Sequence, residues 1–183
     1  MNISKTSLSG LSVVETTPNI DSRGKFARLY CANELSNLIG TRKIAHINHS
    51  ITSEVGAIRG IHFQIAPHAE MKLVRCLRGR VWDVVVDIRQ NSATFLQWHA
   101  EVLSAANNRM VVIPEGFAHG FQTLEPNSEL LYLHTDFYAP EAEGGLNFND
   151  PLLNIDWPLK PTDLSPRDRM HAHIDITFKG IAL

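Results

Sequence analysis

Residues 73–88 read LVRCLRGRVWDVVVDI, and this stretch decides the fold class. Two apolar runs, Leu73–Leu77 and Val81–Ile88, flank the short turn Arg78-Gly79-Arg80. β-Branched residues crowd the second run, as is typical of a strand. The pattern predicts two strands joined as a hairpin.

Two further pairs of apolar runs follow this one along the chain. Phe95–Leu103 and Arg109–Ile113 flank a turn-like gap, and Ala118–Leu124 and Glu129–Asp136 flank another. Successive hairpins at this spacing favour an all-β domain, either a sandwich or a jelly-roll barrel.

Helical signals are few. Only Ala32–Ile39 has apolar residues at helical intervals. The segment from Pro140 to Pro166 is rich in Pro, Asn, Asp and Gly, which predicts loops packed around the barrel. No repeat or linker is visible, so we expect one domain over residues 1–183 with short peripheral helices.

Composition excludes several classes of protein. The formal net charge of −2 argues against nucleic-acid binding through bulk charge. The N-terminus Met1–Thr6 lacks an apolar targeting region, and no uninterrupted apolar run has membrane-spanning length. Cys31 and Cys76 lack metal-ligand spacing, and we expect both to be reduced core residues. We therefore expect a cytoplasmic protein with no membrane or nucleic-acid partner.

Residues suited to proton transfer gather in two blocks. The block Arg59-Gly60-Ile61-His62-Phe63-Gln64, followed by Lys72, sets a histidine between two cations. A second block, Pro114–Phe121, contains His119 and is followed by Tyr132. A histidine can act as a base, cations can steady a developing negative charge, and a phenol can act as an acid.

Strand periodicity places some of these side chains. Lys72 lies on the same face as Val74, and Tyr132 on the same face as Leu130. If these apolar residues point into the barrel, Lys72 and Tyr132 point there too, and buried polar groups of this kind line ligand cavities. Arg59 and His62 have opposite parity, so they converge only if an irregularity intervenes, which Gly60 can supply.

Each residue alone also has a structural interpretation. An isolated His62 is more often a hydrogen-bonded structural histidine than a base, and Tyr132 alone is more often a core aromatic. Asp168 lies in a segment where a capping or turn role is the default. Spacing alone therefore leaves the site open.

The order of motifs along the chain favours a functional interpretation of these residues over a structural one. Residues 10–168 resemble the dTDP-4-dehydrorhamnose 3,5-epimerase family, whose members are nucleotide-sugar epimerases on a cupin-type jelly roll. The motifs that carry the resemblance are Asp21-x-Arg23-Gly24-x-Phe26, Asn48-His49-Ser50, Arg59-Gly60-Ile61-His62-Phe63-Gln64, Lys72-Leu73-Val74, Pro114-Glu115-Gly116-Phe117-Ala118-His119-Gly120-Phe121, Tyr132, Tyr138 and Ile155-Asp156-Trp157-Pro158.

The resemblance implies a role for each matching residue. His62 matches the catalytic base, Asp168 its carboxylate partner, Tyr132 the proton donor and Lys72 the cation near the C4 oxygen of the sugar. The positions that match substrate-binding residues are Arg23, Phe26, Arg28, Asn48, Arg59, His119, Tyr138, Glu143 and Arg167.

The implied reaction inverts C3 and/or C5 of a 4-keto-6-deoxyhexose through an enolate. Its expected substrate is dTDP-4-dehydro-6-deoxy-D-glucose and its product dTDP-4-dehydro-L-rhamnose, with no cofactor and no metal. The resemblance also implies a homodimer in which Arg23 and Phe26 line the neighbour's site. We expect the N-terminal segment, with Ile3 and Leu8, to add to a partner's sheet.

The chain departs from the family pattern at a few positions. Arg28 stands where the family usually has glutamate, and His46-Ile47 where a Gln-Asp pair is common. Glu70 replaces the usual glutamine, and Arg167 the usual lysine. The acid–base set is intact, whereas the preferred nucleotide and sugar stay open.

Two rival classes remain. A metal-dependent cupin enzyme would use His62, His68, Glu70 and His119 as ligands. Such proteins typically carry a His-x-His pair, and residue 64 here is Gln64. A noncatalytic sugar-binding cupin is the other class, and retention of the whole acid–base set argues against it.

Overall fold

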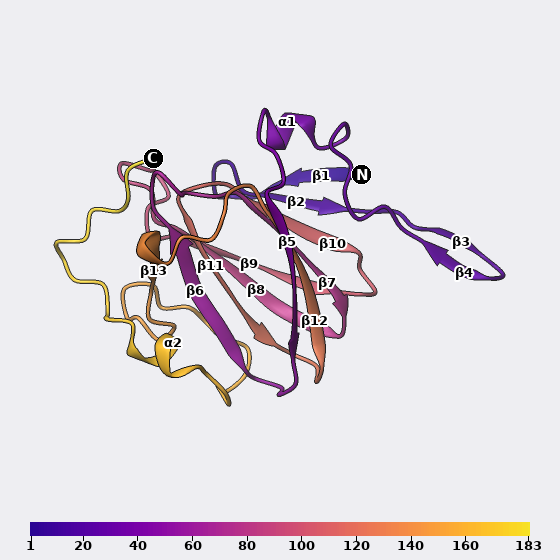
Figure 1. The fold of residues 1–183 in the computed structure, drawn as a ribbon. Coiled ribbons are helices and arrows are strands. Elements are labelled where there is room, and N and C mark those ends of the chain that lie inside the picture. Colours follow the sequence, from indigo (N-terminus) through magenta and orange to yellow (C-terminus); the bar gives the residue numbers. More distant parts are fainter.

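Two facing β-sheets make up most of the molecule (Figure 1). The computed structural model describes residues 1–183. In spatial order, the six-stranded sheet contains β1 (Asn2–Lys5), β2 (Ser12–Glu15), β10 (Arg109–Ile113), β7 (Lys72–Arg78), β12 (Ser128–His134) and β5 (His46–Thr52). The five-stranded sheet contains β13 (Glu143–Gly145), β6 (Ile58–Gln64), β11 (Phe117–Thr123), β8 (Arg80–Asp87) and β9 (Trp98–Ser104). The predicted all-β jelly roll is confirmed.

The three predicted hairpins are wrong, although all six of their strands form. β7 pairs with β10 and β12, whereas β8, the next strand in sequence, pairs with β9 and β11 in the other sheet. The same crossing separates β9 from β10 and β11 from β12. Local spacing locates the turns correctly. The apolar face of each strand is buried best, however, when consecutive strands join different sheets and their apolar faces pack against each other.

The main core lies between the sheets. Val74 and Leu130 from the six-stranded sheet belong to one buried cluster with Val85 and Phe121 from the five-stranded sheet. Tyr132 packs against this cluster from the same face of β12 as Leu130. The prediction that these strand faces point inward is confirmed. Polar side chains further along the same faces therefore also point into the interior.

A second core covers the outer face of the six-stranded sheet. Leu35 and Ile39 pack there in a cluster that includes Leu73. The predicted helix over Ala32–Ile39 is shorter than expected, because only α1 (Ser36–Ile39) is helical and turns precede it.

Loops cover the outer face of the five-stranded sheet. The segment from Pro140 to Pro166 is mostly irregular, as predicted, apart from the 3₁₀ helix η1 (Pro140–Ala142) and the short strand β13. α2 (Pro166–Met170) follows, and its N-cap Ser165 accepts a hydrogen bond from the backbone of Asp168. No helix in the molecule has both the length and the apolarity needed to span a bilayer.

The N-terminal segment forms an edge strand of the six-stranded sheet. β1 pairs with β2 of its own chain, with Ile3 opposite Val14, and Leu8 is buried in the main core. The outer edge of β1 pairs with no strand of the chain, so the addition of this segment to a partner's sheet stays a prediction.

A two-stranded arm extends from the body. It consists of β3 (Asn19–Asp21) and β4 (Gly24–Phe26), which pair only with each other and project away from both sheets (Figure 1). Ile20 is 76% exposed and Phe26 is 73% exposed. No contact within the chain buries these two apolar side chains of the arm.

The two cysteines are both free. Cys76 is buried in the main core, as predicted, whereas Cys31 is only partly buried.

Candidate active site

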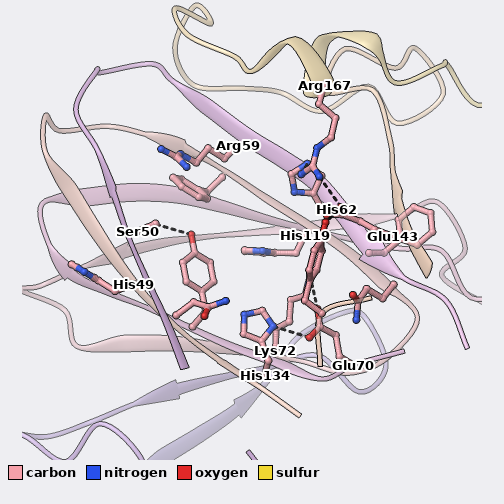
Figure 2. Close-up of a pocket in the computed structure, with 16 residues that line it drawn as sticks. His49, Ser50, Arg59, His62, Glu70, Lys72, His119, His134, Glu143 and Arg167 are labelled. Carbon is pink, nitrogen blue, oxygen red and sulfur yellow. Dashed lines mark hydrogen bonds and ion pairs between the residues drawn. The ribbon is translucent and has the colours of Figure 1, made fainter. Parts of the chain in front are cut away.

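A cavity of about 340 Å³ opens between the two sheets (Figure 2). The five-stranded sheet contributes Arg59, His62, Phe63, Gln64, His119, Phe121 and Glu143 to its lining, and the six-stranded sheet contributes Asn48, His49, Ser50, Lys72, Tyr132 and His134. Glu70, Tyr138 and Arg167 complete the lining from loops and α2. Most of the residues that the sequence singled out therefore meet in one place.

A bulge in β6 turns Arg59 and His62 toward the same cavity. His62 lies opposite His119 and Arg59 opposite Phe121, so β6 has one more residue than β11 over this interval. Gly60 makes the bulge possible, because its φ of 121° is unfavourable for other residues. A Cβ atom there would lie 2.6 Å from the Cα of Gly120. The predicted irregularity at Gly60 is confirmed.

His62 is held by Asp168. His62 Nε2 lies 2.7 Å from Asp168 Oδ1, and the backbone N–H of Gly60 donates to Asp168 Oδ2 over 3.3 Å. A carboxylate only accepts, so Nε2 carries the proton and Nδ1 keeps a lone pair. Burial favours the neutral acid, but the bonds from His62 and Gly60 outweigh it and lower the pKa of Asp168. The pair therefore presents a base backed by a negative charge.

Arg167 closes the rim beside this pair. Its Nη1 donates to Glu143 Oε2 over 2.6 Å, and its Nη2 lies 3.2 Å from His62 Nε2. The Tyr138 hydroxyl donates to the same Glu143 oxygen over 2.9 Å. The side chains of Tyr138 and Arg167 are exposed, so this group borders the open side of the cavity.

Tyr132 reaches the cavity from the opposite sheet. Its hydroxyl lies 3.1 Å from Ser50 Oγ. Burial raises the pKa of Tyr132 to about 12. The phenol therefore stays protonated at neutral pH and can give up its proton to a strong base such as an enolate.

His119 belongs to a second histidine–carboxylate pair. His119 Nε2 lies 2.8 Å from Asp83 Oδ2, and the Asp83 side chain is fully buried. The His119 ring is 6.4 Å from the Tyr132 ring, measured between centroids. Asp83 fixes the orientation of an imidazole that lies between the two sheets.

Lys72 has a carboxylate neighbour on the cavity floor. Lys72 Nζ lies 3.2 Å from Glu70 Oε1, and His134 Nδ1 lies 2.7 Å from Glu70 Oε2. The His134 ring in turn stacks on His46, with 4.4 Å between ring centroids. The cation expected to face the sugar oxygen is thus part of a charged network.

The four ligands proposed for a metal-dependent cupin do not converge. Each has another partner: His62 contacts Asp168, His119 contacts Asp83, Glu70 contacts His134, and His68 lies 3.8 Å from Asp136. The group with metal-ligand proximity is instead His62, Asp168 and His171. The Arg167 guanidinium beside His62 Nε2 opposes a divalent cation there.

Three predicted substrate-binding residues lie outside the cavity of their own chain. Arg23 is on the arm, where it pairs with Asp21 at 2.5 Å, and Phe26 is on the same arm. Arg28 follows the arm and pairs with Glu34 at 2.6 Å. Within one chain, none of the three lines the cavity.

Sequence reasoning missed several residues that shape the site. Ser50, Asp83 and His134 received no role, and Glu70 was considered only as a metal ligand and as a departure from the family pattern. Yet each contacts a residue that did receive a role in the proton transfer or in substrate binding. A signal was present for two of them. Asp83 lies between Val81 and Val85 on the inward face of β8, and His134 shares the inward face of β12 with Tyr132.

Fold and site together define a cupin-like jelly-roll enzyme with an acid–base centre. Residues 5–175 match the dTDP-4-dehydrorhamnose 3,5-epimerase family. The chain belongs to that family.

Individual relatives are similar to this chain over nearly its whole length. The dTDP-4-dehydrorhamnose 3,5-epimerase of Salmonella typhimurium is 43% identical over 171 residues, which cover 92% of each chain. The Bacillus anthracis enzyme of that name, solved with TDP and PPi bound, superposes with a TM-score of 0.91 at 36% identity, covering 94% of this chain and 99% of that one. The dTDP-6-deoxy-D-glucose-3,5-epimerase of Legionella pneumophila, solved in complex with dTDP-4-keto-L-rhamnose, gives a TM-score of 0.86 at 41% identity, with 91% and 89% covered.

Proposed function

We propose that the protein inverts C3 and/or C5 of a nucleotide-linked 4-keto-6-deoxyhexose. The proposed substrate is dTDP-4-dehydro-6-deoxy-D-glucose, and the product is dTDP-4-dehydro-L-rhamnose. The observation that carries this proposal is that His62 and Tyr132 enter one cavity from opposite sheets. Inversion at a carbon needs a base on one face of the sugar and an acid on the other, and this arrangement supplies both.

His62 is the proposed base. A ketone at C4 acidifies the hydrogens on C3 and C5, and the lone pair on His62 Nδ1 removes one of them. Asp168, bonded to Nε2, stabilises the imidazolium that results. The electron pair of the broken C–H bond becomes an enolate, whose negative charge collects on the C4 oxygen.

Lys72 is the proposed partner of that oxygen. Its ammonium group lines the cavity and is only 14% exposed in its side chain, so little water competes for it. A cation already in place in a site of low dielectric stabilises the developing charge without reorganisation.

Tyr132 is the proposed acid. Its hydroxyl gives a proton to the carbon from the face opposite His62, which completes the inversion and restores the ketone. The tyrosinate formed then recovers a proton, while the His62 imidazolium loses one, so the enzyme returns to its starting state. Ser50 holds the hydroxyl in place.

The remaining cavity residues are proposed to bind the substrate. Arg59 suits the diphosphate, because a guanidinium matches phosphate oxygens in a bidentate manner. Asn48, His119, Tyr138, Glu143 and Arg167 are the other proposed contacts within the chain.

We propose a homodimer that completes the site with the β3–β4 arm. The arm carries Arg23 and Phe26 away from the body, and its apolar side chains lack cover within the chain. A second copy that received the arm over its cavity would bury Phe26 and bring Arg23 to the ligand. The free cysteines suit a reducing compartment, and the cytoplasm is our proposed location.

The proposed reaction is tested with several 4-keto-6-deoxy nucleotide sugars in deuterated water. Deuterium at C3 and C5 reports activity and regiochemistry together. Side-by-side kcat/KM values show whether the dTDP sugar is preferred, despite the departures at Arg28 and Ile47. Activity that is lost with a chelator and restored by iron, manganese or zinc would contradict the metal-free reaction.

A further inference from the structure

The ring of His171 fills the space of an absent side chain next to His62. Gly145 of β13 lies opposite His62 in the antiparallel pairing of β13 with β6. A Cβ atom added to Gly145 would overlap with the His171 ring. Directly opposite residues in such a pair project to the same face and touch each other. His171 therefore lies beside His62 in the place that a side chain at position 145 would take.

The two imidazole rings pack in a T-shaped arrangement. Their centroids are 5.9 Å apart, and their planes meet at 70°. Aromatic rings at such distances and angles attract each other. His171 is not among the residues that line the substrate cavity. Any effect that it has on the proposed reaction therefore passes through its neighbours, of which His62 is the proposed base.

Gly145 provides space, and its backbone conformation does not require a glycine. It is not among the glycines with positive φ, so other residues could adopt the same backbone. A side chain there would push the His171 ring away from the strand. The glycine therefore allows a ring from a distant part of the chain to pack directly beside His62.

Main-chain contacts hold His171 in this position. It is the C-cap of α2. Asn147 Nδ2 donates to the His171 carbonyl over 2.7 Å. Asn147 follows Leu146, which exchanges two backbone hydrogen bonds with Ile61 of β6. The position of His171 is therefore fixed relative to the strand that carries His62.

The His171 ring is uncharged at neutral pH. Burial lowers its pKa, and the neighbouring His62 and Arg167 lower it further, while Asp168 and Glu143 act in the opposite direction. A pKa below the ordinary value of about 6.5 leaves the ring neutral at pH 7. Its Nε2 is buried and has no hydrogen-bond partner. The ring therefore offers His62 an uncharged packing surface.

The bond to Asp168 does not by itself fix the whole orientation of His62. A hydrogen bond at Nε2 sets the position of that atom, but the ring can still tilt about the contact. The lone pair on Nδ1 must point at the reacting C–H bond, because proton transfer depends on the distance and direction between the two. A second surface packed against the ring restricts the tilt.

We propose that His171 is a positioning residue for the base: its ring packs against His62 in the space left by Gly145 and, together with Asp168, keeps His62 Nδ1 directed into the cavity. The inference rests on the proposed epimerase reaction. Asp168 within α2 and His171 at the end of α2 thus support the same imidazole from two sides.

The first test compares His171→Ala with His171→Phe. Alanine removes the ring, and we expect kcat for deuterium exchange at C3 and C5 to fall about tenfold with KM little changed, because every side chain that lines the cavity remains. Phenylalanine keeps an uncharged ring and breaks no hydrogen bond of the buried Nε2, so it should recover most of the lost kcat. Its kcat relative to wild type should stay constant between about pH 7 and about pH 9, since the His171 ring does not titrate there.

Gly145→Ala tests the same contact from the neighbouring strand. The added methyl group overlaps with the His171 ring, so we expect kcat to fall in this variant. In the His171→Ala background the methyl group has room and should cause no further fall. Two changes that act through one contact are not additive in free energy, whereas independent changes are.

NMR of the His62 ring nitrogens reports the orientation of the ring without turnover. In the wild type we expect one tautomer, with the proton on the Nε2 that faces Asp168. A ring that tilts away from Asp168 loses the bond that selects this tautomer. His171→Ala should therefore add signals of the tautomer protonated at Nδ1, and His171→Phe should not.

Matched controls are His99→Ala and His99→Phe. His99 is also partly buried and also has a buried Nε2 without a hydrogen-bond partner, but it lies on β9 outside the cavity. Both variants should keep the wild-type kcat, and melting temperatures show that each variant is folded.

Three results would each overturn the role of His171: wild-type kcat in His171→Ala, no recovery in His171→Phe, or a further fall when Gly145→Ala is added to His171→Ala. A wild type without any exchange would instead overturn the proposed reaction. The NMR signals would then still show whether His171 orients the His62 ring.

Discussion

Asp168 Oδ1 lies 2.7 Å from His62 Nε2, although 106 residues separate the two in the chain. The contact joins α2 to the bulged strand β6, so the C-terminal part of the chain completes the proposed base. Replacing His62 with Ala removes the group that we propose as the base. We expect exchange at both carbons to fall by about 10²- to 10⁴-fold, while nucleotide-sugar binding persists. Exchange measured by mass spectrometry checks this, with the exposed His173→Ala as a control; near wild-type exchange would rule His62 out.

Asp168→Asn should be milder than the loss of His62. The imidazole remains, but it loses the negative charge that stabilises its protonated form, and the amide can also donate to Nε2 and favour the wrong tautomer. Single-turnover rates compare the two variants, and thermal unfolding checks that the buried site stays intact. A loss as large as that of His62→Ala would mean that the carboxylate does more than orient the ring.

Tyr132→Phe removes only the hydroxyl that we propose as the proton donor. Deprotonation by His62 should survive, so deuterium still enters the substrate from the His62 face while inverted product falls by about 10²-fold or more. NMR of the recovered sugar separates exchange from inversion. Ser50→Ala leaves the tyrosine hydroxyl but removes its partner, and its effect should be smaller. A normal yield of inverted sugar from Tyr132→Phe would reject the assignment.

The arm should act on the neighbouring subunit. We expect light scattering to give a dimer mass, and Arg23→Ala/Phe26→Ala to raise KM without lowering the melting temperature, because neither side chain is buried in its own chain. Mixing this variant with His62→Ala tests the exchange directly. Hybrid dimers have one intact site, so about a quarter of wild-type activity should return if subunits mix freely. If tagged chains show that the subunits mix but activity does not recover, the arm does not complete the neighbour's site.

Asp87 should govern stability in acid. Burial opposes its ionisation, but bonds from Arg89, Ser92 and Thr94 outweigh burial and lower its pKa to about 2. The folded pKa is below the value of about 4 expected for the unfolded chain, so this stabilisation is present above pH 4 and is lost as pH falls toward 2. Asp87→Asn should lower the free energy of unfolding at pH 7 by about 2 kcal/mol. It should also make the free energy of unfolding depend less on pH between about pH 4 and pH 2. Urea unfolding at several pH values measures this, and the exposed Asp156→Asn should change little.

The sequence predicts strand positions better than strand partners. Alternation in Leu73–Leu77 and Val81–Ile88 identifies two strands correctly, because that signal comes from residues close in sequence. Which sheet each strand joins depends on burial against distant residues, which no local pattern reports. The hairpin across Gly79 was therefore wrong, while both of its strands were right.

The site residues show the same difference between what the sequence predicts and what only the fold reveals. Motif order identified His62 and Tyr132, and the structure brings both to one cavity. Asp83 was missed because a single acidic residue among valines has an ordinary surface interpretation until the fold shows that its side chain faces inward. Glu70 was named only as a candidate metal ligand and as a departure from the family pattern, since its contact with His134 spans 64 residues of the chain.

The crossing of strand pairs between sheets has a consequence for how the chain reaches its native state. Only the β1–β2, β3–β4 and β8–β9 pairs join strands that are consecutive in sequence, whereas the other pairs, such as β5 with β12 and β2 with β10, join distant segments. Domains dominated by such distant pairings fold on the millisecond-to-second scale, since loop closure must precede the contacts that reward it. His62 and Asp168 meet only after most of the chain has been synthesised. A nascent chain therefore gains its proton-transfer centre in one late step, when α2 docks beside β6.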